Sequence, residues 1–200
     1  MLRFQRPALL CCLLFCLAVM LWACGRKTGN ETPKPVAYFR IDLPEHRYVR
    51  TDTTLPFRFE RSAETNIAII PKKEGSCWID LEYPALNATL KLTYLPILNA
   101  DSLRDLIVRE DKMVKFHYQK AEDVEYSIIK DADSRLWGQI YDIEGRDVAT
   151  PFIFWMTDSS RHFLRGSLYF NFTPNNDSLE PVIKYLREDA LHFVNTFQWK

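Results

Sequence analysis

Residues 148–172, VATPFIFWMTDSSRHFLRGSLYFNF, give the strongest indication of the fold class. It contains two apolar runs, 152–156 and 162–170, which are separated by turn-forming residues at 158–160. Large apolar side chains occur at both odd and even positions of each run, whereas a strand with one face in water alternates apolar with polar residues. We therefore expect an antiparallel hairpin within a sheet that is covered on both faces.

Further segments have strand patterns, and two of them are clear. Residues 77–83 and 89–94 alternate apolar with polar side chains, which is typical of a half-buried strand. The less regular runs lie at 57–60, 67–70, 124–130 and 136–143. The turn-forming residues Glu144 and Gly145 then lead into a strand at 148–157, and the next strand covers 162–172.

Two segments have the apolar spacing of helices that could cover this sheet. Asp101 or Ser102 can cap the first helix, and Ser178 can cap the second, with Pro181 tolerated in its first turn. The apolar stripe of the second helix consists of Leu179, Val182, Ile183, Leu186, Ala190, Phe193, Val194 and Phe197. We interpret this stripe as core packing, and a membrane-bound or partner-binding helix is the alternative. The expected fold is α+β, an antiparallel β-sheet covered by helices on both faces, in a single globular domain at 37–200.

Charge and cysteine content limit the possible partners and cofactors. The chain has 26 Lys and Arg against 26 Asp and Glu, and the basic residues form no stripe, so no nucleic-acid partner is expected. Of the five cysteines, only Cys77 lies in the predicted domain, where its apolar neighbours indicate a buried, inert thiol. The sequence has no cofactor motif, and its four histidines lack metal-ligand spacing, so we expect neither cofactor nor metal.

The N-terminus has the organisation of a bacterial lipoprotein precursor. Two arginines precede an uncharged apolar run at 8–22, which has the length of a secretory signal and is short for a membrane-spanning helix. The run ends in Leu21-Trp22-Ala23-Cys24, which is similar to a lipobox, in which a small residue precedes the lipid-modified cysteine. We predict a signal peptide at 1–23 and a lipidated Cys24 with its linker at 24–36, and an uncleaved anchor helix is the alternative. The lipid would hold the protein to a membrane of the cell envelope, facing the periplasm.

The polar stretch at 157–166 is the richest candidate for chemistry. Asp158, Ser159 and His162 are the residue types of a hydrolytic triad, and a hairpin turn would bring them together. A nucleophile also needs donors for the oxyanion and a base held in register, and no motif in the sequence supplies them. Hydrogen bonding of Asp and Ser to their own backbone explains the same residues. We therefore expect a structural turn, with a binding surface as the second interpretation.

Arg165 and two asparagines complete the candidate interaction surface. Arg165 lies on an otherwise apolar strand, so it must be paired or lie at an edge, and a paired structural arginine is favoured over a ligand-binding one. Asn175 and Asn176 precede the last helix and can either bond a partner or turn the chain. The candidate surface therefore consists of Asp158, His162, Arg165, Asn175 and Asn176. No residue is assigned a catalytic or metal-binding role.

Several segments carry a family resemblance. They are YFRIDLP at 38–44, CWIDLEYP at 77–84, HFLRGSLYF at 162–170 and PNNDSL at 174–179. Together they resemble the gliding-motility lipoprotein GldD family of Bacteroidota. The resemblance implies a non-enzymatic accessory component of the gliding motility and type IX secretion apparatus, with other envelope proteins as partners. The order of elements also resembles the Mog1/PsbP-like fold, which is an analogy of shape.

A rival hypothesis is a periplasmic enzyme or ligand-binding protein that acts on envelope glycan or peptide. A cavity lined by Asp158, His162 and Arg165 would favour it, and packed side chains there would favour the accessory role.

The family resemblance also implies a modification. Asp52-Thr53-Thr54, Asp101-Ser102-Leu103 and Asp177-Ser178-Leu179 are similar to the acceptor triplet of the O-glycosylation system of Bacteroidota. The two serines sit where helices should begin, and an N-cap hydroxyl is already engaged. Thr53 lies in a polar stretch where a loop would tolerate a glycan, so Thr53 is the first candidate.

Overall fold

The computed structural model describes residues 41–173 and 175–200. The predicted signal peptide, Cys24 and the linker lie outside the described residues. Within the described part of the chain, no helix is long and apolar enough to cross a membrane. The elements are β1 (Tyr48–Arg50), β2 (Phe57–Arg58), β3 (Glu60–Ser62), β4 (Asn66–Pro71), η1 (Lys73–Gly75), β5 (Cys77–Tyr83), η2 (Pro84–Leu86), β6 (Ala88–Pro96), α2 (Ala100–His117), β7 (Asp123–Asp131), β8 (Leu136–Glu144), β9 (Phe152–Thr157), β10 (His162–Phe170), α3 (Asn176–Thr196) and β11 (Gln198–Trp199).

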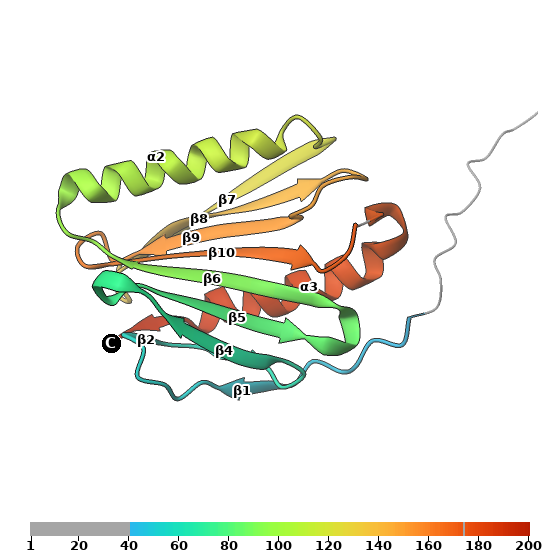
Figure 1. Ribbon diagram of the computed structural model, residues 1–200, viewed down its shortest axis with the longest axis horizontal. Helices are drawn as coiled ribbons and strands as arrows, with labels where there is room; N and C mark the ends of the chain where they lie inside the picture. Colours follow the sequence, from blue (N-terminus) through green and yellow to red (C-terminus); the bar gives the residue numbers. More distant parts are fainter. Residues whose placement is uncertain (1–40, 174) are drawn as a thin grey trace, which may run out of the picture. The chain divides into compact units, whose positions relative to one another are not determined.

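Seven strands form one antiparallel sheet in the order β4-β5-β6-β10-β9-β8-β7 (Figure 1). The hairpin of β9 and β10 places Phe154 opposite Gly166 and Trp155 opposite Arg165. β10 also pairs along its whole length with β6, and β9 pairs with β8. The predicted antiparallel hairpin is confirmed, and it lies in the interior of the sheet.

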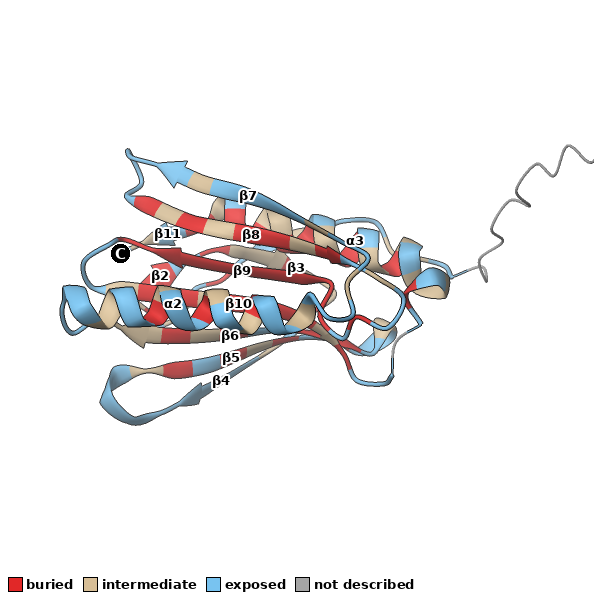
Figure 2. Cartoon of the chain, turned by 90° about the horizontal axis from the view of Figure 1, so that it is seen from above, coloured by how far each residue is buried: buried red, intermediate tan, exposed pale blue. Residues whose placement is uncertain are grey.

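Both faces of this hairpin are buried, each under a different helix. Phe152, Phe154 and Met156 point to one face, where they belong to the core that contains the apolar stripe of α3. Ile153 and Trp155 point to the other face, where they belong to a second core with apolar residues of α2. Figure 2 shows β9 buried along its length, and the two helices lie on opposite faces of the sheet. The α+β class, with an antiparallel sheet covered by helices on both faces, is confirmed.

The core under α3 is rich in aromatic side chains. The ring of Phe193 lies 4.6 Å from that of Phe59 and 5.7 Å from that of Phe154, measured between centroids. Burial of one such side chain contributes about 1.5–3 kcal/mol. Gly166 leaves room for Phe154, since a Cβ at position 166 would lie 2.2 Å from the Cζ atom of that ring. The α3 stripe is therefore core packing, as the sequence predicted.

Helix α2 begins earlier than predicted. Its N-cap is Asn99, whose Oδ1 accepts the N–H of Ser102 at 2.8 Å. The hydroxyl oxygen of Ser102 accepts the N–H of Asn99 at 3.0 Å, which completes a capping box. The prediction that Asp101 or Ser102 is the cap was wrong, because Ser102 takes the third helical position of this motif.

Helix α3 also begins earlier than predicted, at Asn176. Asn175 is its N-cap residue, and the carbonyl of Asn175 accepts the N–H groups of Ser178 and Leu179. The prediction of Ser178 as the cap was therefore wrong. Pro181 lies inside the helix, beyond its first turn.

Several strand boundaries differ from the prediction, most of them by one or two residues. Residues 57–60 divide between β2, which pairs with the C-terminal β11, and β3, which pairs with β1. The strand predicted at 148–157 begins only at Phe152, because the N–H of Val148 bonds back to the carbonyl of Gly145 in a turn. The last predicted strand ends at Phe170.

Candidate functional site

The turn between β9 and β10 uses its polar side chains to hold its own backbone. Oδ1 of Asp158 accepts the N–H groups of Ser160, Arg161 and His162 at 2.8–3.0 Å, and its Oδ2 accepts the hydroxyl of Ser160 at 2.9 Å. Burial of Asp158 opposes its ionisation, but these hydrogen bonds outweigh burial and lower its pKa to about 2. The carboxylate is therefore ionised and occupied by the turn, which is the structural interpretation that the sequence favoured.

His162 is held by aromatic neighbours on the α3 side of the sheet. Its Nδ1 lies 2.8 Å from the hydroxyl of Tyr94, and its ring stacks on Trp199 with centroids 5.2 Å apart. Burial lowers the pKa of the imidazole. Oδ2 of Asp158 accepts the hydroxyl of Ser160, and the N–H of Ser159 donates to Oγ1 of Thr157 at 2.9 Å. Asp158, Ser159 and His162 therefore do not form the hydrogen-bond chain of a hydrolytic triad.

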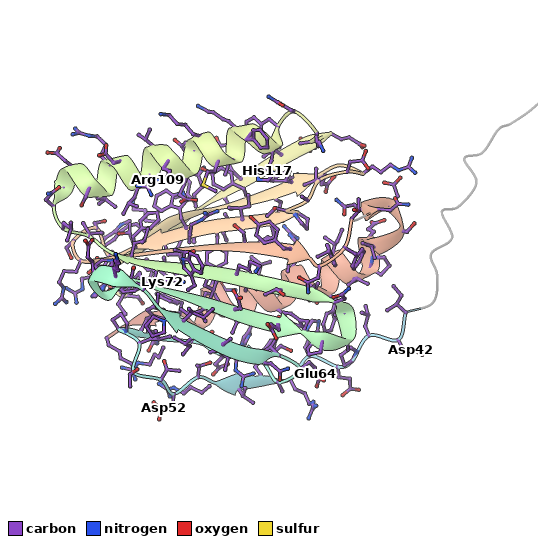
Figure 3. The ribbon with its side chains drawn as sticks, viewed as in Figure 1. Asp42, Asp52, Glu64, Lys72, Arg109 and His117 are labelled. Atoms are coloured by element: carbon purple, nitrogen blue, oxygen red, sulfur yellow. The ribbon has the colours of Figure 1, made fainter. Side chains whose placement is uncertain are left out.

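Arg165 points to the opposite face of the sheet, beneath α2. Its Nε lies 3.1 Å from Oε2 of Glu110, whose side chain is only 3 % exposed. Burial raises the pKa of Glu110, and the charge of Arg165 opposes that shift. His117, labelled at the end of α2 in Figure 3, has a pKa lowered by burial and then by the charge of Arg165. Arg165 is therefore a paired arginine, and the structure does not bring it into one cavity with Asp158 and His162.

The two asparagines have different environments at the start of α3. Asn175 is exposed, and its side chain makes no capping bond. Asn176 is only 8 % exposed, and its Nδ2 donates to the carbonyls of Gly145 at 2.7 Å and Val148 at 2.9 Å. Oδ1 of Asn176 is buried and has no hydrogen-bond partner among the described residues. Asn176 thus ties α3 to the loop between β8 and β9.

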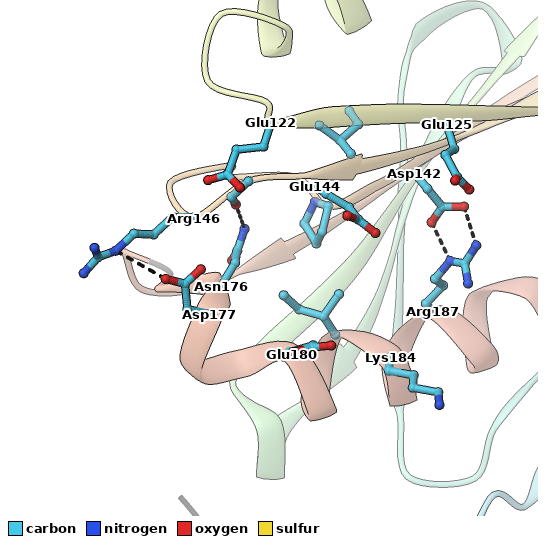
Figure 4. Close-up of a pocket in the computed structure, with 14 residues that line it drawn as sticks. Glu122, Glu125, Asp142, Glu144, Arg146, Asn176, Asp177, Glu180, Lys184 and Arg187 are labelled. Atoms are coloured by element: carbon cyan, nitrogen blue, oxygen red, sulfur yellow. Dashed lines mark hydrogen bonds and ion pairs between the residues drawn. The ribbon is translucent and has the colours of Figure 1, made fainter. Parts of the chain in front are cut away.

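Asn176 lines an acidic groove of about 500 Å³ between that loop, the adjoining ends of β7 and β8, and α3 (Figure 4). Six acidic and three basic side chains line this groove, so its charge is negative. The acidic residues are Glu122, Glu125, Asp142, Glu144, Asp177 and Glu180.

Two ion pairs occupy part of the groove wall. Arg187 binds Asp142 through two hydrogen bonds of 2.5 and 2.6 Å, and Arg146 lies 3.8 Å from Asp177. The bond to Asp142 raises the pKa of Arg187, and the nearby charges of Glu125 and Glu144 add to this effect. The groove therefore has an excess of negative charge and already binds two guanidinium groups of the chain itself.

A second polar cluster fastens the N-terminal segment to α3. The two ring nitrogens of His46 lie 2.7 Å from Asp189 and 3.0 Å from Glu188, and Asp189 is fully buried. Tyr48 stacks on His192 with centroids 3.5 Å apart. The chain just after the predicted linker is thereby fixed to the C-terminal helix.

The remaining residues singled out from the sequence are Thr53 and Cys77. Thr53 lies in a loop, half-buried, and its Oγ1 accepts the N–H of Leu55 at 3.3 Å. Cys77 is buried, and burial raises the pKa of its thiol, as expected for an inert cysteine. Among the residues that the structure describes, no three His, Cys, Asp or Glu side chains are grouped to hold a metal ion.

Sequence reasoning missed both the acidic groove and the cluster around His46. Each is assembled from segments that are distant in the chain, and no local motif marks either of them. The one available signal was the acidic content of 122–125 and 142–144, which gains meaning only when the register of β7 and β8 is known.

Comparison with protein families decides the assignment. The sequence model of the gliding motility lipoprotein GldD matches residues 28–199, which is most of the chain. The chain belongs to the GldD family. A search of curated proteins finds no match to this GldD-family chain.

Among solved structures, this GldD-family chain is similar to the solution structure of cyanobacterial PsbP (CyanoP) from Synechocystis sp. PCC 6803. The TM-score is 0.47 and the sequence identity 13 %, and the match covers 81 % of this chain and 98 % of CyanoP.

Proposed function

We propose that this chain is a lipid-anchored accessory component of the gliding motility and type IX secretion apparatus, and that it acts through protein contacts rather than by catalysis. Membership of the GldD family supports the role in gliding. The lipobox-like Leu21-Trp22-Ala23-Cys24 supports lipid attachment at Cys24. The linker that follows would keep the domain close to the membrane, facing the periplasm.

One observation supports a role without catalysis. The polar side chains of the turn at 158–162 already bond to or pack against other groups of the same domain. Asp158 accepts bonds from its own turn, His162 contacts Tyr94 and Trp199, and the charge of Arg165 is matched by Glu110 on the other face. A hydrolytic site needs a nucleophile, a base and an oriented carboxylate that converge on one reacting atom. The arrangement of these side chains favours a structural role for each of them.

Complementation in the native bacterium tests this proposal. In cells that lack the gene, copies with Ser159→Ala or His162→Gln should restore colony spreading to the wild-type rate, because the proposed role uses neither the hydroxyl of Ser159 nor the imidazole of His162. Thermal unfolding of each purified variant controls for lost stability. If a stable His162→Gln protein left the cells unable to spread, catalysis or binding at the turn would replace the proposed role.

Secretion of cargo protein tests the proposed role in type IX secretion separately from gliding. Deletion of the gene should lower the amount of a type IX cargo protein in the culture medium, and the wild-type copy should restore it. Unchanged secretion in the deletion strain would limit the role to motility.

A further inference from the structure

Strand β7 is a long edge of the sheet that neither proline nor a bulge interrupts. Its nine residues pair in unbroken register with β8 and, among the described residues, with no other strand. Natural sheets protect such edges with short strands, prolines, bulges or charged side chains, because unpaired backbone groups attract another strand. The charged residues of β7 are mainly acidic, so they disfavour an acidic strand and favour a basic one. The opposite edge, β4, has six residues and ends in Pro71, whereas β7 contains neither proline nor a bulge. β7 is therefore the edge that could receive an added strand.

The face of β7 on the α2 side is apolar although it is exposed. Tyr126 and Ile128 are neighbours on this face, and 65 % and 72 % of their surfaces are exposed. Figure 2 shows that most of β7 is exposed. Leu98 and Phe116 are exposed to a similar extent elsewhere, but neither lies beside unpaired strand backbone. An exposed aromatic and aliphatic pair on a strand edge is typical of an interaction surface.

The face of β7 on the α3 side is acidic. Asp123 and Glu125 are exposed on it, and Glu125 lies beside Asp142 at the acidic groove (Figure 4). The groove wall also contains the buried Oδ1 of Asn176, an acceptor without a donor among the described residues. This side of the edge therefore offers negative charge and an unused acceptor, and both suit a ligand that carries N–H donors and positive charge.

We propose that β7 receives an extended segment of a partner protein, which adds to the sheet as a further strand and alternates apolar with basic side chains. The apolar side chains lie beside Tyr126 and Ile128, and the lysine or arginine side chains lie beside Glu125 and reach the acidic groove. Backbone pairing supplies affinity and the alternating side chains supply specificity, as in other cases of strand addition. The inference rests on the proposed accessory role and names the chemistry of the partner.

A second copy of this chain suits the edge less well. Each β7 strand has three acidic residues, Asp123, Glu125 and Asp131, and one basic residue, Lys130. Two paired β7 strands would therefore both be negatively charged and would repel each other. Charge complementarity favours a basic partner over a second copy.

Peptide binding to the purified lipoprotein in detergent tests the edge without reference to gliding. The probe is a labelled nine-residue peptide that alternates lysine and valine, and the matched control peptide alternates glutamate and valine. Fluorescence anisotropy should show binding of the lysine peptide alone, weakened by added salt. Equal binding of both peptides, or of neither, would overturn the proposal.

Paired variants locate the binding. Glu125→Lys and Ile128→Lys should each weaken the lysine peptide about tenfold or more, because both place positive charge on the edge. Glu82→Lys and Leu98→Lys are the matched controls, exposed at other places, and should leave the affinity within about twofold. Loss of binding in the controls as well, or in none of the four, would show that the peptide binds elsewhere.

Crosslinking in the native cell identifies the occupant. A photoreactive amino acid at position 128 should capture a peptide of another protein with alternating apolar and basic residues, and Glu125→Lys should abolish this product. Capture of a second copy of this chain, or equal capture from position 98, would overturn the proposal. Peptide binding at β7 in a protein that proves dispensable for gliding would refute the proposed function while leaving the docking edge in place.

Discussion

Replacement of Asp158 measures how much the turn depends on its carboxylate. The folded pKa of about 2, against the ordinary value of 3.8, corresponds to about 2 kcal/mol of stability from the ionised form. Asp158 is only 7 % exposed, so solvent screens little of this contribution. Asp158→Ala should therefore lower the free energy of unfolding at pH 7 by about 2 kcal/mol or more, since the N–H groups of Ser160, Arg161 and His162 also lose their acceptor.

The pH dependence of this loss separates the carboxylate from other effects. Because the folded pKa lies below the unfolded one, the contribution is complete above about pH 4 and disappears as the pH falls toward 2. Urea unfolding of the wild type and the variant between pH 2 and 7 should show a difference that shrinks in this window. Asp131→Ala is the matched control, because Asp131 accepts similar turn bonds in an exposed position and should matter less. A difference between wild type and Asp158→Ala that stays constant from pH 7 to pH 2 would refute the reasoning.

Three further predictions concern the core, the last helix and the glycan. Gly166→Ala should lower the free energy of unfolding by about 2 kcal/mol, measured in urea, because its Cβ would lie 2.2 Å from Phe154; an unchanged midpoint would contradict this. Truncation after Asn176 should leave the chain unfolded or insoluble. It removes buried side chains that contribute about 1.5–3 kcal/mol each, and the free energy of unfolding of a whole domain is only about 5–15 kcal/mol. A soluble fragment with a cooperative thermal transition would show that the helix is dispensable. Intact-mass spectrometry of protein from the native host should show the added mass of a glycan, which we expect at Thr53, and a mass equal to polypeptide plus lipid would end that hypothesis.

The sequence was informative where one segment alone contains the physical signal. Residues 152–156 are apolar at every position, so their burial on two faces could be predicted without knowing their partners. The stripe of α3 predicted its packing for the same reason. Helix starts were harder, because Asn99, Asp101 and Ser102 are all good caps within one turn, and small differences in local hydrogen bonding choose among them.

The candidate site was predictable only in its local part. The hydrogen bonds that Asp158 accepts in the turn come from residues next to it in the chain, so they could be predicted. An ion-pair partner could also be predicted for Arg165, but the sequence did not identify that partner as Glu110. The acidic groove needs Glu125, Glu144 and Asn176 from three elements, and the faces on which they lie depend on strand register. Such a site is a property of the tertiary fold, and alternation within one strand does not reveal it.

Single-cell gliding speed tests most directly the central claim that a lipid-anchored chain supports motility. Time-lapse microscopy would compare cells that lack the gene with cells that carry the wild type or Cys24→Ser, after metabolic acyl labelling has verified that only the wild type is lipidated. We expect that the deletion stops gliding, that the wild type restores it, and that Cys24→Ser does not restore it even when the chain is made and protease-resistant. Deletion cells that glide at the wild-type speed, or full rescue by an unlipidated chain, would contradict the claim.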